Sequence, residues 1–324
     1  MVGVTASTDA YDRSDSILIP GVSTQHRFTV PQGVLPMRDG VAPSYAWLPH
    51  GDWRTLGAYL AIRFPMVPEQ AWRARMARGD VRDDKGRTLS YDESFVGGQR
   101  IFYYRERINE TPIPFEETVL YQDDEVMVVD KPHFVPVTPG GRFLHESLLV
   151  RLRRKTGLQS ISPIHRLDRE TAGVMLFSVN PVTRPIWQAL FRFRRVHKTY
   201  EALAPVRADL SLPRVISSRI VRDEQFFRVK EVAGEPNAFT RVELLSHAGD
   251  VGHYRLLPET GKMHQLRIHM SSLGLPILND SFYPFATQCS NEDFSSPLKL
   301  LARSIEFVDP VCGIERSFQS ARSL

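Results

Sequence analysis

Segments with the pattern of β-strands follow one another along the C-terminal two thirds of this 324-residue chain. We predict strands at residues 119–121, 126–130, 174–179, 199–204, 219–221, 227–232, 240–246, 252–257 and 304–308. Three helices are predicted among them, at residues 144–155, 181–193 and 261–273. Strands that succeed one another without regular β–α–β alternation are typical of antiparallel pairing. The sequence therefore predicts an α+β domain with a mixed, largely antiparallel β-sheet flanked by helices.

A shorter pattern precedes this domain. Residues 51–106 contain two helix-like stretches, at 56–64 and 68–78, and then short strands at 81–82, 88–90 and 100–104. This order predicts a small N-terminal helix–helix–hairpin domain. Proline and glycine recur through residues 1–50 and predict an extended arm, and Pro112 and Pro114 suggest a linker over 107–115. The large domain would then span residues 116–324.

Composition narrows the class of protein. The chain lacks an apolar run of the roughly 18 residues that a membrane-spanning helix needs. Its first 16 residues are polar and acidic, unlike a secretory signal peptide. The two cysteines, Cys289 and Cys312, exclude a disulfide scaffold and lack the spacing of zinc ligands. We therefore expect a cytoplasmic protein without a membrane anchor.

Positive charge is concentrated in one part of the chain. The net charge is only +4, yet residues 143–200 contain eleven Lys or Arg and three Asp or Glu. Such a band favours a polyanionic partner. The alternative is an ordinary solvated surface, which is what charge runs commonly form.

Three short segments combine residues that can carry out chemistry. In the first, HRLDRETAG at residues 165–173, Asp168 lies among His165, Arg166 and Arg169. An aspartate in such surroundings serves as a nucleophile or a base when its neighbours fix its protonation state. A capping or ion-paired loop aspartate is the alternative.

The second segment, Lys198-Thr199-Tyr200, brings a tyrosine into a strand beside a lysine. That tyrosine either stacks on a nucleic-acid base or packs in the sheet. In the third segment, residues 260–269, a Thr-Gly turn is expected to open a helix whose N-terminus favours an anion. Arg267 is there a surface residue or, if buried, one that needs a carboxylate. His264 and His269 are five residues apart, not the four of a helical metal site, so we expect no metal.

In this order, the three segments resemble the signatures of the RluA-type RNA pseudouridine synthases: HRLD-x-x-T-[SA]-G, K-x-Y and T-G-[RK]-x-H-Q-[LI]-R-x-H. Residues 128–132, VVDKP, resemble the strand and Lys-Pro pair that lead into that family's domain. The resemblance spans about residues 116–320. Ala172 stands where serine is commoner, and Leu301-Ala302 where a His-Ala pair is frequent. Residues 51–106 are similar, more weakly, to the ribosomal-protein-like RNA-binding domain found in many members.

The resemblance implies an isomerase that converts uridine in RNA to pseudouridine without a cofactor. Asp168 would be the essential carboxylate, Tyr200 would stack on the uracil, and Arg267 would pair with Asp168. Arg166 would fill the gap left by the flipped base. Further expected RNA contacts are His165, Arg169, Lys198, His264, Gln265, Arg151, Arg153, Arg154, Lys155, Arg192, Arg194, Arg195, Arg73, Arg75 and Arg78.

Ribosomal RNA is the expected substrate and transfer RNA the alternative, and we expect a monomer. A non-catalytic RNA-binding or ribosome-assembly protein is a rival reading. The intact Asp168, Tyr200 and Arg267 argue against it, because a pure binder has no use for a buried charge pair. A glycoside hydrolase would need two cooperating carboxylates, and residues 143–200 offer few acids.

Overall fold

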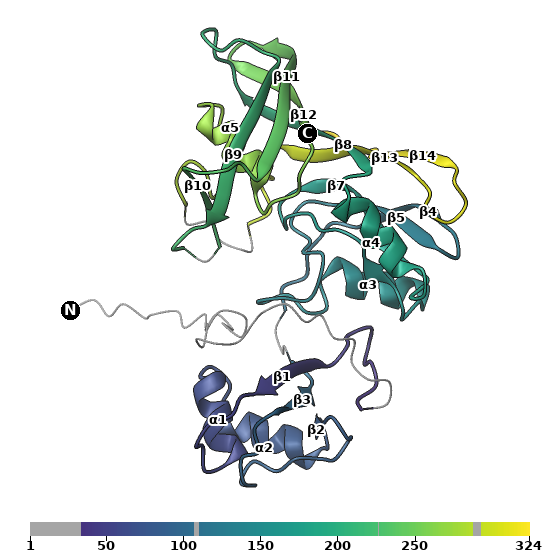
Figure 1. The fold of residues 1–324 in the computed structure, drawn as a ribbon, viewed down its shortest axis with the longest axis vertical. Helices are drawn as coiled ribbons and strands as arrows, with labels where there is room; N and C mark the ends of the chain where they lie inside the picture. The colour runs from purple at the N-terminus through teal and green to yellow at the C-terminus, as the bar shows by residue number, and fades with distance from the viewer. Residues whose placement is uncertain (1–33, 107–109, 226, 288–292) are drawn as a thin grey trace, which may run out of the picture. The chain divides into compact units, whose positions relative to one another are not determined.

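The computed structural model describes residues 34–106, 110–225, 227–287 and 293–324 (Figure 1). The first 33 residues of the expected arm and residues 107–109 of the expected linker lie outside the described residues. The chain divides into two compact units, Met1–Glu110 with Pro139–His145, and Thr111–Thr138 with Glu146–Leu324. The loop Pro139–His145, which we expected in the large domain, therefore belongs to the smaller unit.

The smaller unit pairs two helices with a three-stranded antiparallel sheet. Its elements are β1 (Ser44–Leu48), α1 (Leu56–Arg63), α2 (Glu69–Ala77), β2 (Val81–Asp83) and β3 (Gln99–Tyr103), with the sheet order β1-β3-β2. Leu60, Trp72 and Ile101 are fully buried where helices and sheet meet. The strand expected at 88–90 is only an isolated bridge between Arg82 and Thr88. The third strand is β1, from the end of the expected arm, where Tyr45 and Ala46 pair with β3.

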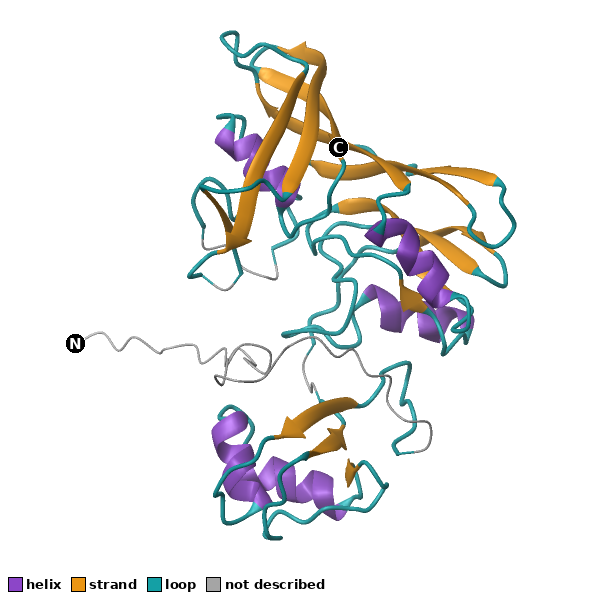
Figure 2. Ribbon diagram, viewed as in Figure 1, coloured by secondary structure: helices purple, strands orange, loops and turns teal. Residues whose placement is uncertain are grey.

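The larger unit is built on one eleven-stranded sheet (Figure 2). Its strands are β4 (Thr118–Gln122), β5 (Val126–Lys131), β6 (Ser162–Pro163), β7 (Ala172–Ser178), β8 (Val196–Pro205), β9 (Arg214–Arg222), β10 (Val229–Val232), β11 (Ala238–Ala248), β12 (Val251–Pro258), β13 (Leu300–Val308) and β14 (Glu315–Gln319). The order is β10-β9-β11-β12-β8-β13-β7-β5-β4, with β14 on β13 and β6 on β7. Among the described strands, only β7 and β13 pair in parallel. This confirms the mixed, largely antiparallel sheet.

Three helices, α3 (Leu148–Thr156), α4 (Arg184–Arg192) and α5 (Gln265–Ser272), complete the larger unit. Trp187 and Leu190 of α4 pack with residues of β5, β7 and β13, and Leu266 and Met270 of α5 pack with residues of β8, β11 and β12. In the described parts of the chain, none of the helices has the length and apolar character needed to cross a membrane.

All three helices begin later than predicted, and α4 begins at Arg184 instead of residue 181. The segment before α3 includes Leu144 and His145, whose backbone amides donate to the carboxylate of Glu110 instead of starting a helix. The expected helix at 261–273 begins only at Gln265, because His264 has a left-handed backbone with φ 52°. Residues 260–264 therefore form a loop. An anion site on a helix that opens at Gly261 was a wrong prediction.

The parallel pair β7–β13 leads the chain into the site. Gly173 at the start of β7 has φ +114°, and a Cβ added there would lie 2.2 Å from the backbone oxygen of Ala302 on β13. Only glycine permits this close approach of two backbones. It brings the loop that carries Asp168, just before β7, next to the central strands.

Candidate active site

Asp168 lies on the loop between β6 and β7. A buried lysine, Lys131, holds this loop by a hydrogen bond to its backbone. Lys131, at the end of β5, is fully buried. Its ammonium donates to the backbone oxygens of Arg169 at 2.9 Å, Val135 at 2.8 Å and Pro132 at 3.0 Å. Burial lowers the pKa of Lys131 well below its usual value. Lys131 thus fixes the position of the Arg169 carbonyl, one residue after Asp168.

Arg267 of α5 contacts the same loop through Asp168 and Glu170. Its side chain is 1% exposed, and its Nη1 lies 3.8 Å from Oδ2 of Asp168. The two alternatives for Arg267 are thereby resolved, since it is a buried arginine with carboxylate partners. Burial opposes its charge, but Asp280, Glu170 and Asp168 together raise the pKa of Arg267 above its usual value. Its guanidinium is therefore a permanent cation inside the site.

Two carboxylates that we did not assign lie closer to Arg267 than Asp168 does. Asp280 accepts from Nε at 2.9 Å and from Nη2 at 2.6 Å, and Glu170 accepts from Nη2 at 2.9 Å. Glu170 is inside the HRLDRETAG segment, and Asp280 follows α5 after a short loop. Their chemistry was visible in the sequence, but Asp280 is 112 residues from Asp168, and only the fold brings it near. Counting acids within residues 143–200 therefore underestimated the carboxylates of this site.

Tyr200 lies on the central strand β8, where its backbone pairs with Leu256 of β12 and Ala302 of β13. Burial, and then the charge of Asp168, raise the pKa of the Tyr200 phenol. The ring is therefore neutral at physiological pH. Tyr200 thus contributes a flat, uncharged ring to the site.

Asp168, Tyr200 and Arg267 line one small cavity of about 90 Å³. Its other lining residues are Arg166, Leu167, Thr171, Lys198, Pro258, Thr260, Gly261, Lys262, His264, Gln265, Leu266 and Leu300. All three sequence segments thus converge on one place. Arg166 and Lys262 are exposed, Asp168 is partly exposed and Arg267 is buried. The exposed basic residues that line the cavity suit a phosphate-bearing ligand.

Two further residues that line the cavity, Lys198 and His264, have lowered pKa values. Lys198 donates to the backbone oxygen of Thr260 at 3.2 Å, and burial together with Arg194 lowers the pKa of Lys198 to about 8. His264 has its Nε2 3.9 Å from Oδ1 of Asp168 and its Nδ1 3.2 Å from the hydroxyl of Tyr283. Burial lowers the pKa of His264, so its ring is neutral at physiological pH.

Three residues that we expected to contact RNA form hydrogen bonds within the protein. Gln265 donates to Phe239 O and to Thr240 Oγ1, and its own oxygen accepts from Thr260 Oγ1 and from the amide of Lys262. His165 accepts from the amide of Leu176 and stacks on Phe191 at 4.5 Å, while burial lowers its pKa to about 3. Arg169 donates from Nε to Phe134 O. These contacts give all three residues a structural role, and their expected contacts with RNA stay predictions.

The basic band divides into inward and outward members. Arg151 donates to Phe115 O and Ile113 O and pairs with Glu146. Arg153 donates to Ile161 O, and burial lowers its pKa to about 10. The exposed members are Arg154, Lys155, Arg192, Arg194 and Arg195. Arg151 donates from both Nη groups and Arg153 from Nη2 within the protein, so phosphate contacts are favoured more for the exposed members than for these two.

The arginines of α2 also have partners within the smaller unit. Arg73 pairs with Glu69 and with both oxygens of Asp92. Arg75 is 7% exposed and pairs with Glu106, and Arg78 pairs with Asp80 and Glu106. The three arginines of α2, which we expected to hold phosphates, thus also form ion pairs with carboxylates of the same unit.

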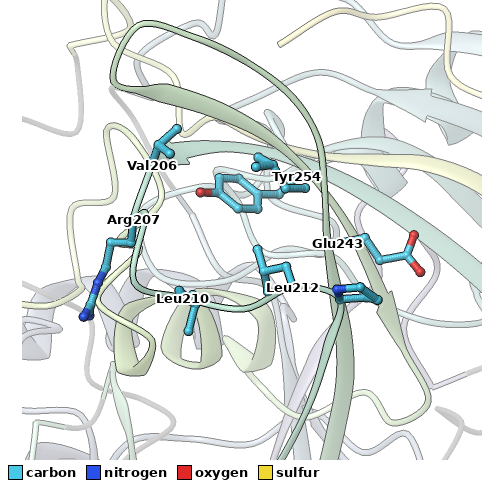
Figure 3. Close-up of a pocket in the computed structure, with 8 residues that line it drawn as sticks. Val206, Arg207, Leu210, Leu212, Glu243 and Tyr254 are labelled. Carbon is cyan, nitrogen blue, oxygen red and sulfur yellow. The ribbon is translucent and has the colours of Figure 1, made fainter.

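A larger cavity of about 470 Å³ lies elsewhere in the larger unit, between the β8–β9 loop and strands β11 and β12 (Figure 3). Its polar residues are occupied: Arg207 pairs with Asp209, Glu243 with Arg241 and Arg255, and the Tyr254 hydroxyl donates to Pro205 O. None of the three sequence segments contributes to its lining. We therefore take the smaller cavity as the candidate active site, because the residues of all three segments line it.

Fold and site together define an RNA-modifying isomerase, and comparison with known proteins agrees. Residues 125–272 match the family model for RNA pseudouridylate synthase. The chain is 36% identical over 172 residues to the dual-specificity RNA pseudouridine synthase RluA of Escherichia coli K12, covering 51% of this chain and 76% of that protein. It is 28% identical over 228 residues to an uncharacterized RNA pseudouridine synthase of Synechocystis, covering 69% and 78%. This chain belongs to the RluA-type RNA pseudouridine synthases.

A solved structure shares the fold. The human RNA pseudouridylate synthase domain containing 1 superposes with a TM-score of 0.52 at 26% identity, covering 63% of this chain and 84% of that one. The resemblance stated from the motifs is thereby confirmed for the large domain.

Proposed function

We propose that this protein isomerises specific uridines of a structured RNA to pseudouridine, with Asp168 as the essential carboxylate. The observation that carries the proposal is the shared cavity, which Asp168 lines together with Tyr200 and with Arg267, whose Nη1 lies 3.8 Å from the Asp168 carboxylate. The Arg267 guanidinium places a positive charge close to this carboxylate, which the reaction uses either to attack the anomeric carbon or to remove a ribose proton.

The reaction is an isomerisation, so no group is imported and no cofactor is required. The bond from uracil N1 to the ribose breaks, the base turns, and C5 bonds to the anomeric carbon. C5 then loses its proton, and N1 gains one. The uridine must first leave the base stack, at a cost of a few kcal/mol. Arg166 is exposed at the cavity and suits the vacated position, because a planar cation can stack between bases. The neutral ring of Tyr200 suits the flipped uracil.

For the substrate, we propose ribosomal RNA, with transfer RNA as the alternative, and a cytoplasmic monomer as the acting form. The smaller unit is proposed to help select the RNA. Its α2 arginines are paired with carboxylates, so selection would use other surfaces of that unit. The most direct test compares pseudouridine maps of total RNA from cells with and without the gene. A site lost from ribosomal RNA supports the proposal, and a site lost only from transfer RNA supports the alternative.

The test of chemistry is tritium release from RNA labelled at C5 of uracil. Asp168→Asn keeps the size of the side chain and removes its charge, so release should stop while RNA binding persists. Asp209→Asn is the matched control, because Asp209 is an exposed aspartate of the same unit paired with Arg207. Turnover of Asp168→Asn at the wild-type rate would reject Asp168 as the essential group. A wild-type protein that binds RNA without releasing tritium would instead support the non-catalytic rival.

A further inference from the structure

Three carboxylates surround Arg267, but they contact different parts of its guanidinium. Arginine offers five N–H donors in a rigid plane. Asp280 takes Nε and one Nη2 proton, and Glu170 takes Nη2 from another direction. Nη1 is the nitrogen next to Asp168, at 3.8 Å. The two close carboxylates therefore use Nε and Nη2, while Nη1 is the nitrogen nearest the reactive group.

Glu170 joins three segments that meet at this point. It lies two residues after Asp168 on the same loop. Its Oε2 accepts from Arg267 of α5, and its Oε1 accepts from the hydroxyl of Ser281 at 2.8 Å. Its backbone oxygen contacts Nδ1 of His133 at 2.6 Å. Both carboxylate oxygens are thus used for holding other groups in place.

Glu170 does not reach the reactive space. Its side chain is 17% exposed, and it is not among the residues that line the cavity shared by Asp168 and Tyr200. It is therefore no catalytic residue. Asp280 by itself leaves the guanidinium held by one carboxylate, from a segment that follows α5. Glu170 adds a second hold that comes from the Asp168 loop itself.

We propose that Glu170 is a positioning residue, which ties Arg267 to the Asp168 loop so that Nη1 faces the Asp168 carboxylate. This inference rests on the proposed role of Asp168. It predicts that removing Glu170 lowers turnover through Arg267, without changing how RNA binds.

Turnover and RNA binding together separate this role from a purely structural one. A structural role lowers the amount of folded protein, so the RNA-binding capacity falls together with the rate. A positioning role lowers kcat per folded molecule and leaves RNA binding as it is.

The experiment compares Glu170→Ala and Glu170→Gln with wild type on one RNA. The matched control is Glu243→Gln, because Glu243 also accepts from two arginines but lies away from the site. For Glu170→Ala we expect kcat to fall about 10- to 100-fold, the scale of one charged hydrogen bond. KM and the RNA-binding capacity should stay within about twofold of wild type. The amide oxygen of Gln still accepts from Nη2, so Glu170→Gln should recover part of kcat.

A second measurement does not depend on activity. In ¹⁵N-labelled protein, a guanidinium held from two directions rotates slowly and gives separate Nη resonances, which Arg267→Met would assign by their loss. We expect these resonances to merge in Glu170→Ala and to persist in Glu243→Gln. Unchanged Arg267 resonances, a kcat within twofold of wild type, or a fall in RNA-binding capacity equal to the fall in rate would each overturn the inference. An inactive wild type with the expected resonance change would reject the proposed function but not the hold on Arg267.

Discussion

Arg267 is bound more closely to Asp280 than to Asp168. Its Nη2 lies 2.6 Å from Oδ1 of Asp280, whereas its Nη1 lies 3.8 Å from Oδ2 of Asp168. The side chains of both Arg267 and Asp280 are 1% exposed, so solvent scarcely reaches this ion pair. The arginine is thus anchored by a permanent partner and leaves its contact with Asp168 adjustable, which suits a carboxylate that must act on a substrate.

Replacing Arg267 by Met should abolish turnover and destabilise the fold. The change leaves Asp280 and Glu170 without their cation, and breaking a buried ion pair in this way costs about 3–5 kcal/mol. Because Arg267 is buried, the salt dependence of RNA binding should not change. Urea unfolding and binding titrations over a range of salt concentrations measure the two effects. A salt slope reduced by about one phosphate, with normal turnover, would identify Arg267 as a backbone contact instead.

Changing Gly173 to alanine should unfold the site, whereas the same change at Gly261 should be tolerated. A Cβ at Gly173 would meet the Ala302 backbone oxygen at 2.2 Å, in a backbone conformation with φ +114°. At Gly261, nothing lies within 4 Å of the added Cβ. We expect a loss of about 2–4 kcal/mol in the free energy of unfolding for Gly173→Ala and a much smaller change for Gly261→Ala. Equal thermal stability of the two variants would contradict this account of the β7–β13 contact.

The contribution of Lys198 to RNA binding should disappear as the pH rises through about 8. Burial and Arg194 lower the pKa of Lys198 from 10.5 to about 8, so the ammonium is charged at pH 7 and largely neutral at pH 9. RNA affinity of the wild type should therefore fall across this range at constant ionic strength. Lys198→Arg keeps its charge and should remove this part of the pH dependence. An identical fall in both proteins would assign the effect to another group.

The same shift predicts how stability depends on pH. Between about pH 8 and 10.5, the unfolded chain binds a proton at Lys198 that the folded chain does not. Stability therefore rises with pH in that window, because the unfolded state binds more protons. Lys198→Met should lack this rise, which urea unfolding at pH 7.5 and 10 would detect.

Among the basic side chains, exposure should decide which ones hold phosphate. Arg194 is exposed, and Arg194→Gln should lower the salt slope of RNA binding by about one. Arg151→Gln should leave the slope unchanged and lower stability, because Arg151 holds Phe115 O, Ile113 O and Glu146. Fluorescence anisotropy with one labelled RNA, at several salt concentrations, measures both variants. Equal effects of the two changes on the slope would show that the inward contacts of Arg151 open when RNA binds.

Local patterns were enough to predict most elements. Alternating and apolar runs located β4, β5, β7 and β8 to β13, because a strand that pairs inside a sheet shows its burial in its own residues. The short strands β6 and β14 lack such a signal and depend on their neighbours for pairing. The start of α5 could not be predicted either, because the left-handed backbone of His264 is imposed by the surrounding loop.

By itself, the sequence determined the reactive groups: Asp168, Tyr200 and Arg267 stand in motifs whose residue types and order can be recognised without a fold. Only the tertiary structure decided which charges meet. Asp280 and Glu170 became the closest partners of Arg267, while His165, Gln265 and Arg151 turned inward to hold other parts of the chain. The physical reason is that a charge or hydrogen-bonding group acts over a few ångströms. Its partners are therefore set by distances in space, which separations along the chain do not reveal.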